Sequence, residues 1–240
     1  KQSEEAVAYL NGAVDKNPSF GAAYDLLYGI AMIQKSPAEA EKIVLRRLKS
    51  NPKDPLVRIR LAAHYFVERN LGEMEKVLAE TLSRKQDFPN AYQDVGDFYY
   101  RIRDYDRAAA TYQEGRKHDS GRARMFDKRL IEVRVAQNRA DEALALCESI
   151  LAEDKNDHEA IAMRASLRLY AGKAEHVDSA ITELQSVVAK MPENFVLRYN
   201  LGRALMTKGD TDGARVQFTD ALRRRPDYMP ARIALAQVLV

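Results

Sequence analysis

An alanine recurs at nearly constant intervals, and this period constrains the fold more than any other feature of the chain. The position is held by Ala6, Ala40, Met74, Ala108, Ala143, Ala180 and Ala214, at steps of 34, 34, 34, 35, 37 and 34 residues. Four residues later comes a larger, mostly apolar side chain: Leu10, Val44, Leu78, Tyr112, Cys147, Leu184 and Phe218. A spacing of four places both residues on one helix face. A period of this length indicates stacked helical units without a single globular core.

A second apolar helix face precedes the alanine in the clearest periods. Its residues follow helical spacing and are Tyr92, Val95, Gly96 and Tyr99 in one period, and Leu201, Gly202 and Leu205 in another. Twelve residues after the alanine, four periods carry Pro18, Pro52, Pro192 and Pro226, and proline favours a break between helices. Gly209-Asp210 and Gly172-Lys173 fall where a left-handed residue would end the first helix. Sustained alternation typical of strands does not occur.

This order of aromatic, Leu-Gly, Tyr, Ala, Phe and Pro over 34 residues resembles the tetratricopeptide repeat, a helix-turn-helix unit. The resemblance implies an all-α fold, a right-handed superhelix (α-solenoid) of about fourteen helices, as a single domain over 1–240. It places a lone second helix at 3–17, repeats at 21–54, 55–88, 89–123, 124–157, 158–194 and 195–228, and a lone first helix at 229–240. Some periods depart from the pattern: the aromatic position holds Arg58, Asp127, Ile161 and Arg198, and the glycine position holds Tyr28 and Ile131.

The last helix lacks a following helix to cover its apolar residues Ile233, Leu235, Ala236 and Leu239. Solenoids need polar capping helices to stay soluble. We therefore expect either a fragment of a longer tetratricopeptide repeat protein or an end that packs on another copy of the chain.

Charge and composition exclude several classes of protein. Lys and Arg number 38 against 35 Asp and Glu, a net charge of +3, so the bulk charge does not demand nucleic acid or an anionic membrane as partner. No apolar run approaches the roughly 18 residues of a membrane-spanning helix. Between residues 101 and 134, ten basic residues are interspersed with six acidic ones, a pattern that favours a salt-bridged surface over a phosphate-binding groove.

Enzyme motifs are absent from the sequence, which has no Gly-x-Gly-x-x-Gly, Walker loop, Gly-x-Ser-x-Gly or His-Glu-x-x-His. The histidines at 64, 118, 158 and 176 lie in different periods without the spacing of metal ligands. Cys147 occupies a repeat position filled elsewhere by Leu, Val, Tyr and Phe, so we expect a buried packing thiol, not a nucleophile. We predict a non-enzymatic protein with no cofactor and no metal.

The resemblance implies a concave groove, lined by the first helices, that binds an extended peptide or a partner helix. Helical periodicity turns positions 2, 5, 6, 9, 12 and 13 of each first helix away from the packing positions. The candidate binding residues are Phe66, Asn90, Gln93, Asp94, Asp97, Tyr100, Arg101, Lys128, Arg129, Glu132, Tyr199, Asn200 and Arg203. The groove is expected to be apolar in the first two repeats, from residues such as Met32, Ile33, Leu56 and Ile59, and polar from the third. For Ile59 and Phe66, core packing between repeats is an equally good interpretation.

The chaperone-tail carboxylate clamp known in this family is not predicted, because Ile59, Ala63 and Asp94 stand where it needs other residues. We predict a scaffold or adaptor that binds a protein or peptide. Residues 226–236 resemble repeats of bacterial envelope proteins tied to exopolysaccharide export, which suggests such an assembly. The alternatives are a self-assembling array, a homo-oligomer through the terminal helices, and a glycan- or nucleic-acid-binding solenoid. Envelope, periplasm and cytoplasm stay open.

Overall fold

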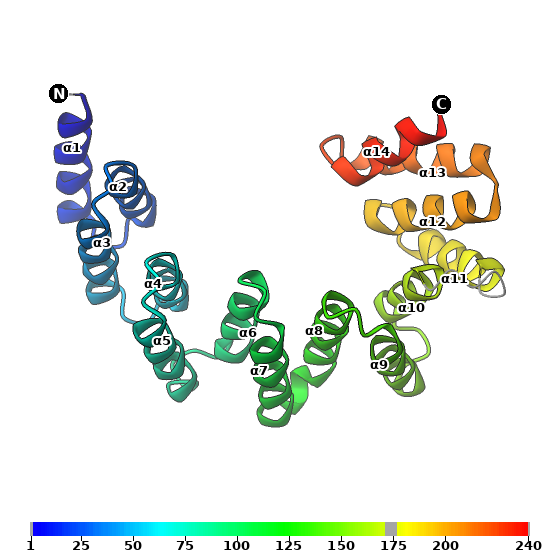
Figure 1. The fold of residues 1–240 in the computed structure, drawn as a ribbon, viewed down its shortest axis with the longest axis horizontal. Coiled ribbons are helices and arrows are strands. Elements are labelled where there is room, and N and C mark those ends of the chain that lie inside the picture. The colour runs from blue at the N-terminus through cyan, green and yellow to red at the C-terminus, as the bar shows by residue number, and fades with distance from the viewer. Residues whose placement is uncertain (1, 171–176, 240) are drawn as a thin grey trace. The chain divides into compact units, whose positions relative to one another are not determined.

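The computed structural model describes residues 2–170 and 177–239, and this part of the chain consists of α-helices with one 3-10 turn and no strand (Figure 1). The chain divides into two compact units, Lys1–His118 and Asp119–Val240. The first unit contains α1 (Gln2–Lys16), α2 (Gly21–Ile33), α3 (Pro37–Ser50), α4 (Pro55–Val67), α5 (Leu71–Ser83), α6 (Ala91–Arg101) and α7 (Tyr105–His118). The second contains η1 (Ser120–Arg122), α8 (Ala123–Ala136), α9 (Ala140–Glu153), α10 (His158–Tyr170), α11 (Val177–Lys190), α12 (Phe195–Lys208), α13 (Thr211–Arg224) and α14 (Met229–Val238).

Within each unit the helices form antiparallel pairs that stack on the next pair. The first helices are α2, α4 and α6 in the first unit and α8, α10 and α12 in the second, and each packs on the helix that follows it. Consecutive pairs contact one another through α4 and α6 in the first unit and through α10 and α12 in the second. The all-α repeat fold is therefore confirmed. The repeat limits and the single domain over 1–240 stay predictions.

Short polar side chains before the helices explain where several of them begin. The Asp54 carboxylate accepts a hydrogen bond from the Leu56 N–H at 3.0 Å, with Pro55 as the first helical residue of α4. Asn194 accepts from the N–H of Val196 at 3.0 Å before α12. These bonds satisfy amide donors that have no partner inside the helix.

The turn between the two helices of a repeat uses a left-handed residue. Gly209 has φ of +87° after α12, as the sequence predicted, while Gly172-Lys173 lies outside the described residues. The equivalent residues of the other described turns are not glycine: they are Lys35, Arg69, Arg103 and Asn138, with φ of 54°, 58°, 63° and 60°. Side chains with a Cβ rarely adopt this conformation, and asparagine tolerates it best.

A small residue of the first helix packs against a large residue of the second helix, sixteen residues later. A Cβ added to Gly96 would lie 2.3 Å from Cε1 of Tyr112, and one added to Gly202 would lie 2.5 Å from Cε1 of Phe218. Where the first helix instead carries a large residue, the second carries a small one: the pairs are Tyr28 with Val44 and Ile131 with Cys147. Ile131 and Cys147 belong to one buried cluster. A large residue in place of the glycine is thus matched by a smaller residue on the second helix of the same repeat.

Candidate functional site

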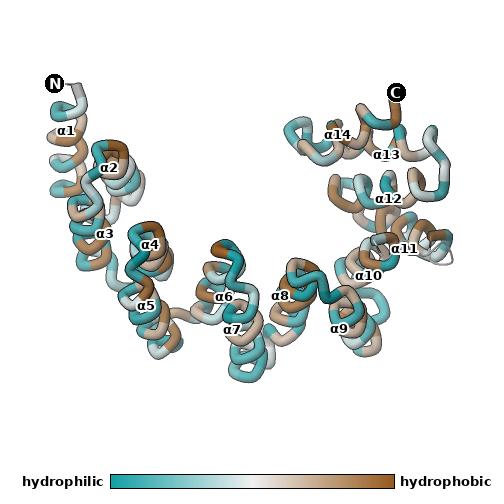
Figure 2. The backbone as a smooth tube through the Cα atoms, in the orientation of Figure 1, coloured by the Kyte–Doolittle hydropathy of each residue, from teal (hydrophilic) through white to brown (hydrophobic). Residues whose placement is uncertain are grey.

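The first unit exposes large apolar side chains on its first helices. We call this set the apolar band: Leu26 and Ile33 of α2, and Leu56, Phe66 and Val67 of α4. The side chain of Ile33 is 83% exposed and that of Leu56 is 66% exposed. Leu26 and Ile33 are seven residues apart and lie on one face of α2, and Leu56 and Val67, eleven apart, lie on one face of α4. Figure 2 shows hydrophobic stretches in both helices.

Ile59 and Phe66, for which the sequence left two interpretations open, behave differently. Ile59 is 7% exposed, so it belongs to the core and is not a groove residue. Phe66 remains 38% exposed while its ring makes an edge-to-face contact with Phe98 of α6, with 6.5 Å between the ring centroids. The two residues lie seven apart and therefore on one face of α4, with Phe66 next to the last residue of that helix.

The remaining candidates in the first unit lie on or just before α6. Asn90 and Arg101 are exposed, while Gln93, Asp94, Asp97 and Tyr100 are half-buried. The Tyr112 hydroxyl donates a hydrogen bond to Asp97 Oδ1 at 2.6 Å, so this carboxylate helps to hold α7 on α6. The Tyr100 ring packs against Tyr105, with 5.6 Å between centroids. Part of this polar surface is thus engaged within its own repeat.

The candidate charges in the second unit bind one another and their neighbours. Lys128 Nζ lies 2.9 Å from Asp157 Oδ1 and 2.8 Å from Glu159 Oε2, and Arg129 bonds Glu132 at 3.0 Å. Burial disfavours the Lys128 ammonium, but these two carboxylates outweigh that effect and raise the pKa of Lys128. Burial also opposes the charged form of Asp157, yet the Ala160 N–H and Lys128 lower the pKa of Asp157 below its usual value.

The other candidates of the second unit lie in or beside a cluster of aromatic rings. The Tyr199 ring contacts the rings of Phe218 and Tyr228 at centroid distances of 5.9 and 5.4 Å, and the Arg203 guanidinium lies 6.0 Å from the Tyr199 centroid. Asn200 is half-buried beside them. An open pocket of about 320 Å³ lies between α12 and α14, lined by Tyr199, Met229, Pro230, Ile233, Ala234 and Gln237. The second unit therefore offers a mostly apolar hollow with one cation near its rim.

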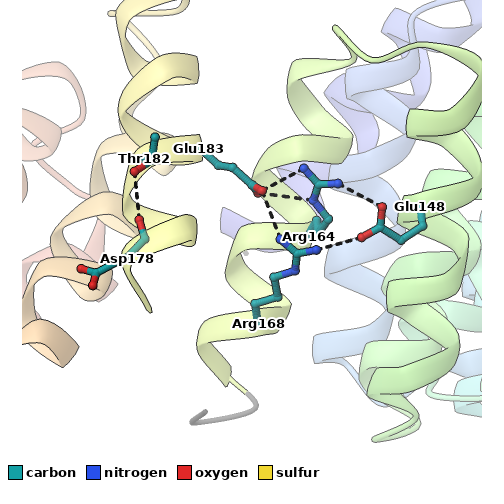
Figure 3. A network of polar contacts seen from close by, with 6 residues as sticks. All are labelled: Glu148, Arg164, Arg168, Asp178, Thr182 and Glu183. Carbon is teal, nitrogen blue, oxygen red and sulfur yellow. Dashed lines mark hydrogen bonds and ion pairs between the residues drawn. The ribbon is translucent and has the colours of Figure 1, made fainter. Parts of the chain in front are cut away.

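Two arginines of α10 join three helices of the second unit (Figure 3). Arg164 bonds Glu183 at 2.9 Å and Glu148 at 3.0 Å, and Arg168 bonds the same two carboxylates at 3.1 and 3.0 Å. Glu148 belongs to α9 and Glu183 to α11. Because each charge faces two of opposite sign, this network is satisfied internally and favours a structural role over ligand binding.

Cys147 and His64, two of the residues that could have carried chemistry, are buried between helices. Cys147 is buried, as the sequence predicted, and burial raises the pKa of its thiol to about 12, so the reactive thiolate does not form at neutral pH. His64 is buried and its Nδ1 lies 3.3 Å from the Tyr28 hydroxyl. His118 is stacked on Tyr92, and His158 begins α10, whereas His176 lies outside the described residues. Over residues 2–170 and 177–239, no three His, Cys, Asp or Glu side chains gather as metal ligands.

The predicted site residues are thus divided between the two units. Phe66, Asn90, Gln93, Asp94, Asp97, Tyr100 and Arg101 lie in the first, and Lys128, Arg129, Glu132, Tyr199, Asn200 and Arg203 in the second. Their role in binding stays a prediction. Sequence reasoning missed Leu26 and Val67, which the repeat register could have found at positions 6 and 13. No helix in the described part of the chain combines the length and apolarity needed to cross a bilayer.

Comparisons with known proteins agree with the repeat fold. The model of the family described as tetratricopeptide repeat matches residues 96–158, 167–230 and 199–239. Comparison with curated proteins found no match.

Several solved structures are similar to the chain at low sequence identity. A tetratricopeptide repeat protein from Parabacteroides merdae is 19% identical, with a TM-score of 0.61 over 99% of this chain and 93% of its own. The Cut9 and Hcn1 assembly of the APC/C is 14% identical, with a TM-score of 0.54 over 99% of this chain and 46% of the matched one. YrrB, described as a TPR protein with an unusual peptide-binding site, is 21% identical over 80% of this chain and 96% of its own, with a TM-score of 0.49.

Proposed function

Because the chain belongs to the tetratricopeptide repeat family, we propose that it is a non-enzymatic scaffold that binds protein partners. The binding residues are those of the first helices that turn away from the packing positions. The observation that carries this proposal is the apolar band. Exposed apolar side chains that follow one face of α2 and one face of α4 favour a protein interface, since their burial against a partner releases water. The aromatic and arginine pair Tyr199 and Arg203 supports a similar use of the second unit, because these residue types often anchor interfaces.

Site-specific photo-crosslinking tests the proposal directly. A photoreactive phenylalanine analogue is placed at Leu56 or at Arg203, both exposed on first helices. The matched controls carry it at Lys42 of α3 or at Arg223 of α13, whose side chains are 73% and 74% exposed on second helices. After irradiation in lysate of the source cells, crosslinked proteins are identified by mass spectrometry, and circular dichroism checks that all variants are equally helical.

We expect one or more proteins crosslinked from Leu56 or Arg203 and absent from the Lys42 and Arg223 samples. Crosslinks from Lys42 and Arg223 alone, or equal crosslinks from all four positions, would contradict the proposal and move binding to the second helices.

The cellular setting is a finer part of the proposal. We propose an envelope or polysaccharide-export assembly, supported by the likeness of residues 226–236 to repeats of bacterial envelope proteins. Fractionation of source cells, with an antibody against the chain, tests it: the envelope fraction is expected to hold most of the protein, and recovery in the cytoplasmic fraction would contradict it.

A further inference from the structure

Three consecutive turns of the first unit carry a cation where the backbone disfavours one. We call Lys35, Arg69 and Arg103 the cationic turns; each follows a first helix and has a φ between 54° and 63°. Glycine or asparagine is the favoured residue in this conformation, and the second unit uses Asn138 and Gly209 at the equivalent places. Lys and Arg are therefore not explained by the needs of the turn.

The three cations also have no internal partner. Each is exposed, and within the described part of the chain none of the three side chains makes an ion pair or a hydrogen bond. Most other basic residues of the first unit are paired, as Arg47 is with Asp25 at 2.7 Å. Two acidic residues adjoin the cationic turns in sequence: Asp104 is bound by Arg107, and Glu68 stays exposed. Three cations against one free carboxylate leave this edge positively charged.

The cationic turns lie along one edge of the first unit. Tyr28 in the middle of α2 contacts His64 of α4, and Phe66 near the end of α4 contacts Phe98 near the end of α6. Each contact joins residues from the C-terminal halves of two first helices, so the C-terminal ends of α2, α4 and α6 lie on the same side of the unit.

The apolar band adjoins this edge. Ile33 and Val67 are the last residues of α2 and α4, two residues before Lys35 and Arg69. From there the band continues along the helices, for about 10 Å to Leu26 on α2 and about 16 Å to Leu56 on α4. An exposed apolar surface with a row of cations along one side is complementary to a segment that is apolar on one face and acidic beside it.

We propose that the apolar band and the cationic turns together bind an acidic, amphipathic segment of a partner protein. This inference rests on the proposed function and names the chemistry of the partner for the first unit. A protein segment fits better than a membrane surface, because the apolar residues extend along the helices and are not confined to the turns. It also fits better than nucleic acid, because Leu, Ile and Val offer no stacking surface for bases, and Phe66, the one aromatic ring of the band, already packs against Phe98.

Selection of peptides from a random 16-residue display library provides the probe. The full chain is compared with a variant carrying Lys35→Gly, Arg69→Gly and Arg103→Gly. We expect peptides selected by the wild type to be rich in Asp and Glu between apolar residues. A selected acidic peptide is then expected to bind the glycine variant about tenfold more weakly, which is the combined effect of three exposed charge pairs. Its binding should weaken with added salt.

Two further variants separate charge from turn geometry. Lys35→Arg with Arg69→Lys and Arg103→Lys keeps the three charges and is expected to retain binding. Lys42→Gln with Lys76→Gln and Lys117→Gln removes three charges from exposed second-helix positions and is expected to leave binding unchanged. The glycine variant should melt at the same temperature as the wild type or above it, since glycine relieves the left-handed strain.

Several outcomes would overturn the inference. One is the absence of acidic enrichment, and another is equal binding by the glycine variant. A third is tighter binding, dependent on the cationic turns, to vesicles of phosphatidylserine and phosphatidylcholine than to the peptides. The proposed function would survive each of them if the crosslinks from Leu56 and Arg203 still occur, and it would fail separately if those crosslinks are missing.

Discussion

The two units share their internal packing and differ in how the charges on and beside their first helices are paired. In the first unit, the apolar band is exposed and the cationic turns carry charges without internal partners. In the second, the charges on α8 are bound by neighbouring carboxylates, and α9, α10 and α11 are joined by the network of Arg164 and Arg168. One repeat architecture therefore tolerates different arrangements of surface charge, because the residues that pack the helices together are separate from those that face solvent.

The largest effect we expect concerns the packing that both units share. Gly96→Ala and Gly202→Ala should each cost about 1–3 kcal/mol, because the new methyl group would overlap the ring of Tyr112 or Phe218. Hydrogen exchange of α6 and α7, and of α12 and α13, measures the loss within each unit.

A second substitution should restore part of the stability, because it relieves the overlap but removes the hydrogen bond from Tyr112 to Asp97. Gly96→Ala with Tyr112→Leu recreates the alanine and leucine pair that Ala62 and Leu78 already form at these positions. If the double variant is no more stable than Gly96→Ala alone, size compensation is not what holds the repeat together.

A smaller effect should distinguish the units by their response to pH. Asp157→Asn keeps an oxygen that can accept the Ala160 N–H but removes the charge that faces Lys128, so we expect the second unit to lose about 1 kcal/mol at pH 7. The pKa of Asp157 is lowered in the folded state, so its contribution is complete above the unfolded pKa of about 3.9 and is lost as the pH falls below it. Protection of the α10 amides from hydrogen exchange, measured between pH 3 and 7, should therefore vary less with pH in Asp157→Asn than in the wild type.

The matched control is Asp54→Asn in the first unit. Asp54 also begins a first helix, but its nearest cation, Arg47, is 3.7 Å away. An equal loss of stability at Asp54 and Asp157 would show that ion pairing does not distinguish the units.

The smallest effect concerns the α9, α10 and α11 network. Glu183→Gln removes the carboxylate shared by Arg164 and Arg168 and should destabilise α11 by about 0.5–1 kcal/mol at low salt. The difference should shrink in 1 M NaCl, where screening weakens the network. A salt-independent difference, measured by exchange of α11, would instead indicate packing by the glutamate side chain.

The sequence predicted the elements that depend on periodic residues. The alanine period located the helix pairs, Gly209 marked a left-handed turn, and the register explained why Cys147 is buried. Helix formation and burial follow from local spacing, which a single sequence contains.

The candidate site was less accessible to sequence reasoning, because it depends on distances between repeats. The hydrogen bond from Tyr112 to Asp97 and the ion pairs of Lys128 arise only when side chains from different helices meet. The left-handed conformation of Arg69 contradicts the residue's own preference, so its local sequence gives no sign of it. Alignment of that turn with Gly209 would have revealed it.

The compensated pairs bear on how the gene can rearrange. Gly96 and Tyr112, like Ile131 and Cys147, are matched in size inside one repeat. A duplication or deletion whose ends fall between repeats, near Pro52 or Pro226, moves both members of a pair together. A crossover between the two helices would join Gly96 to Cys147 and leave a void, or join Tyr28 to Leu78 and force an overlap. The junctions between repeats are thus the points at which this chain can gain or lose copies and still fold.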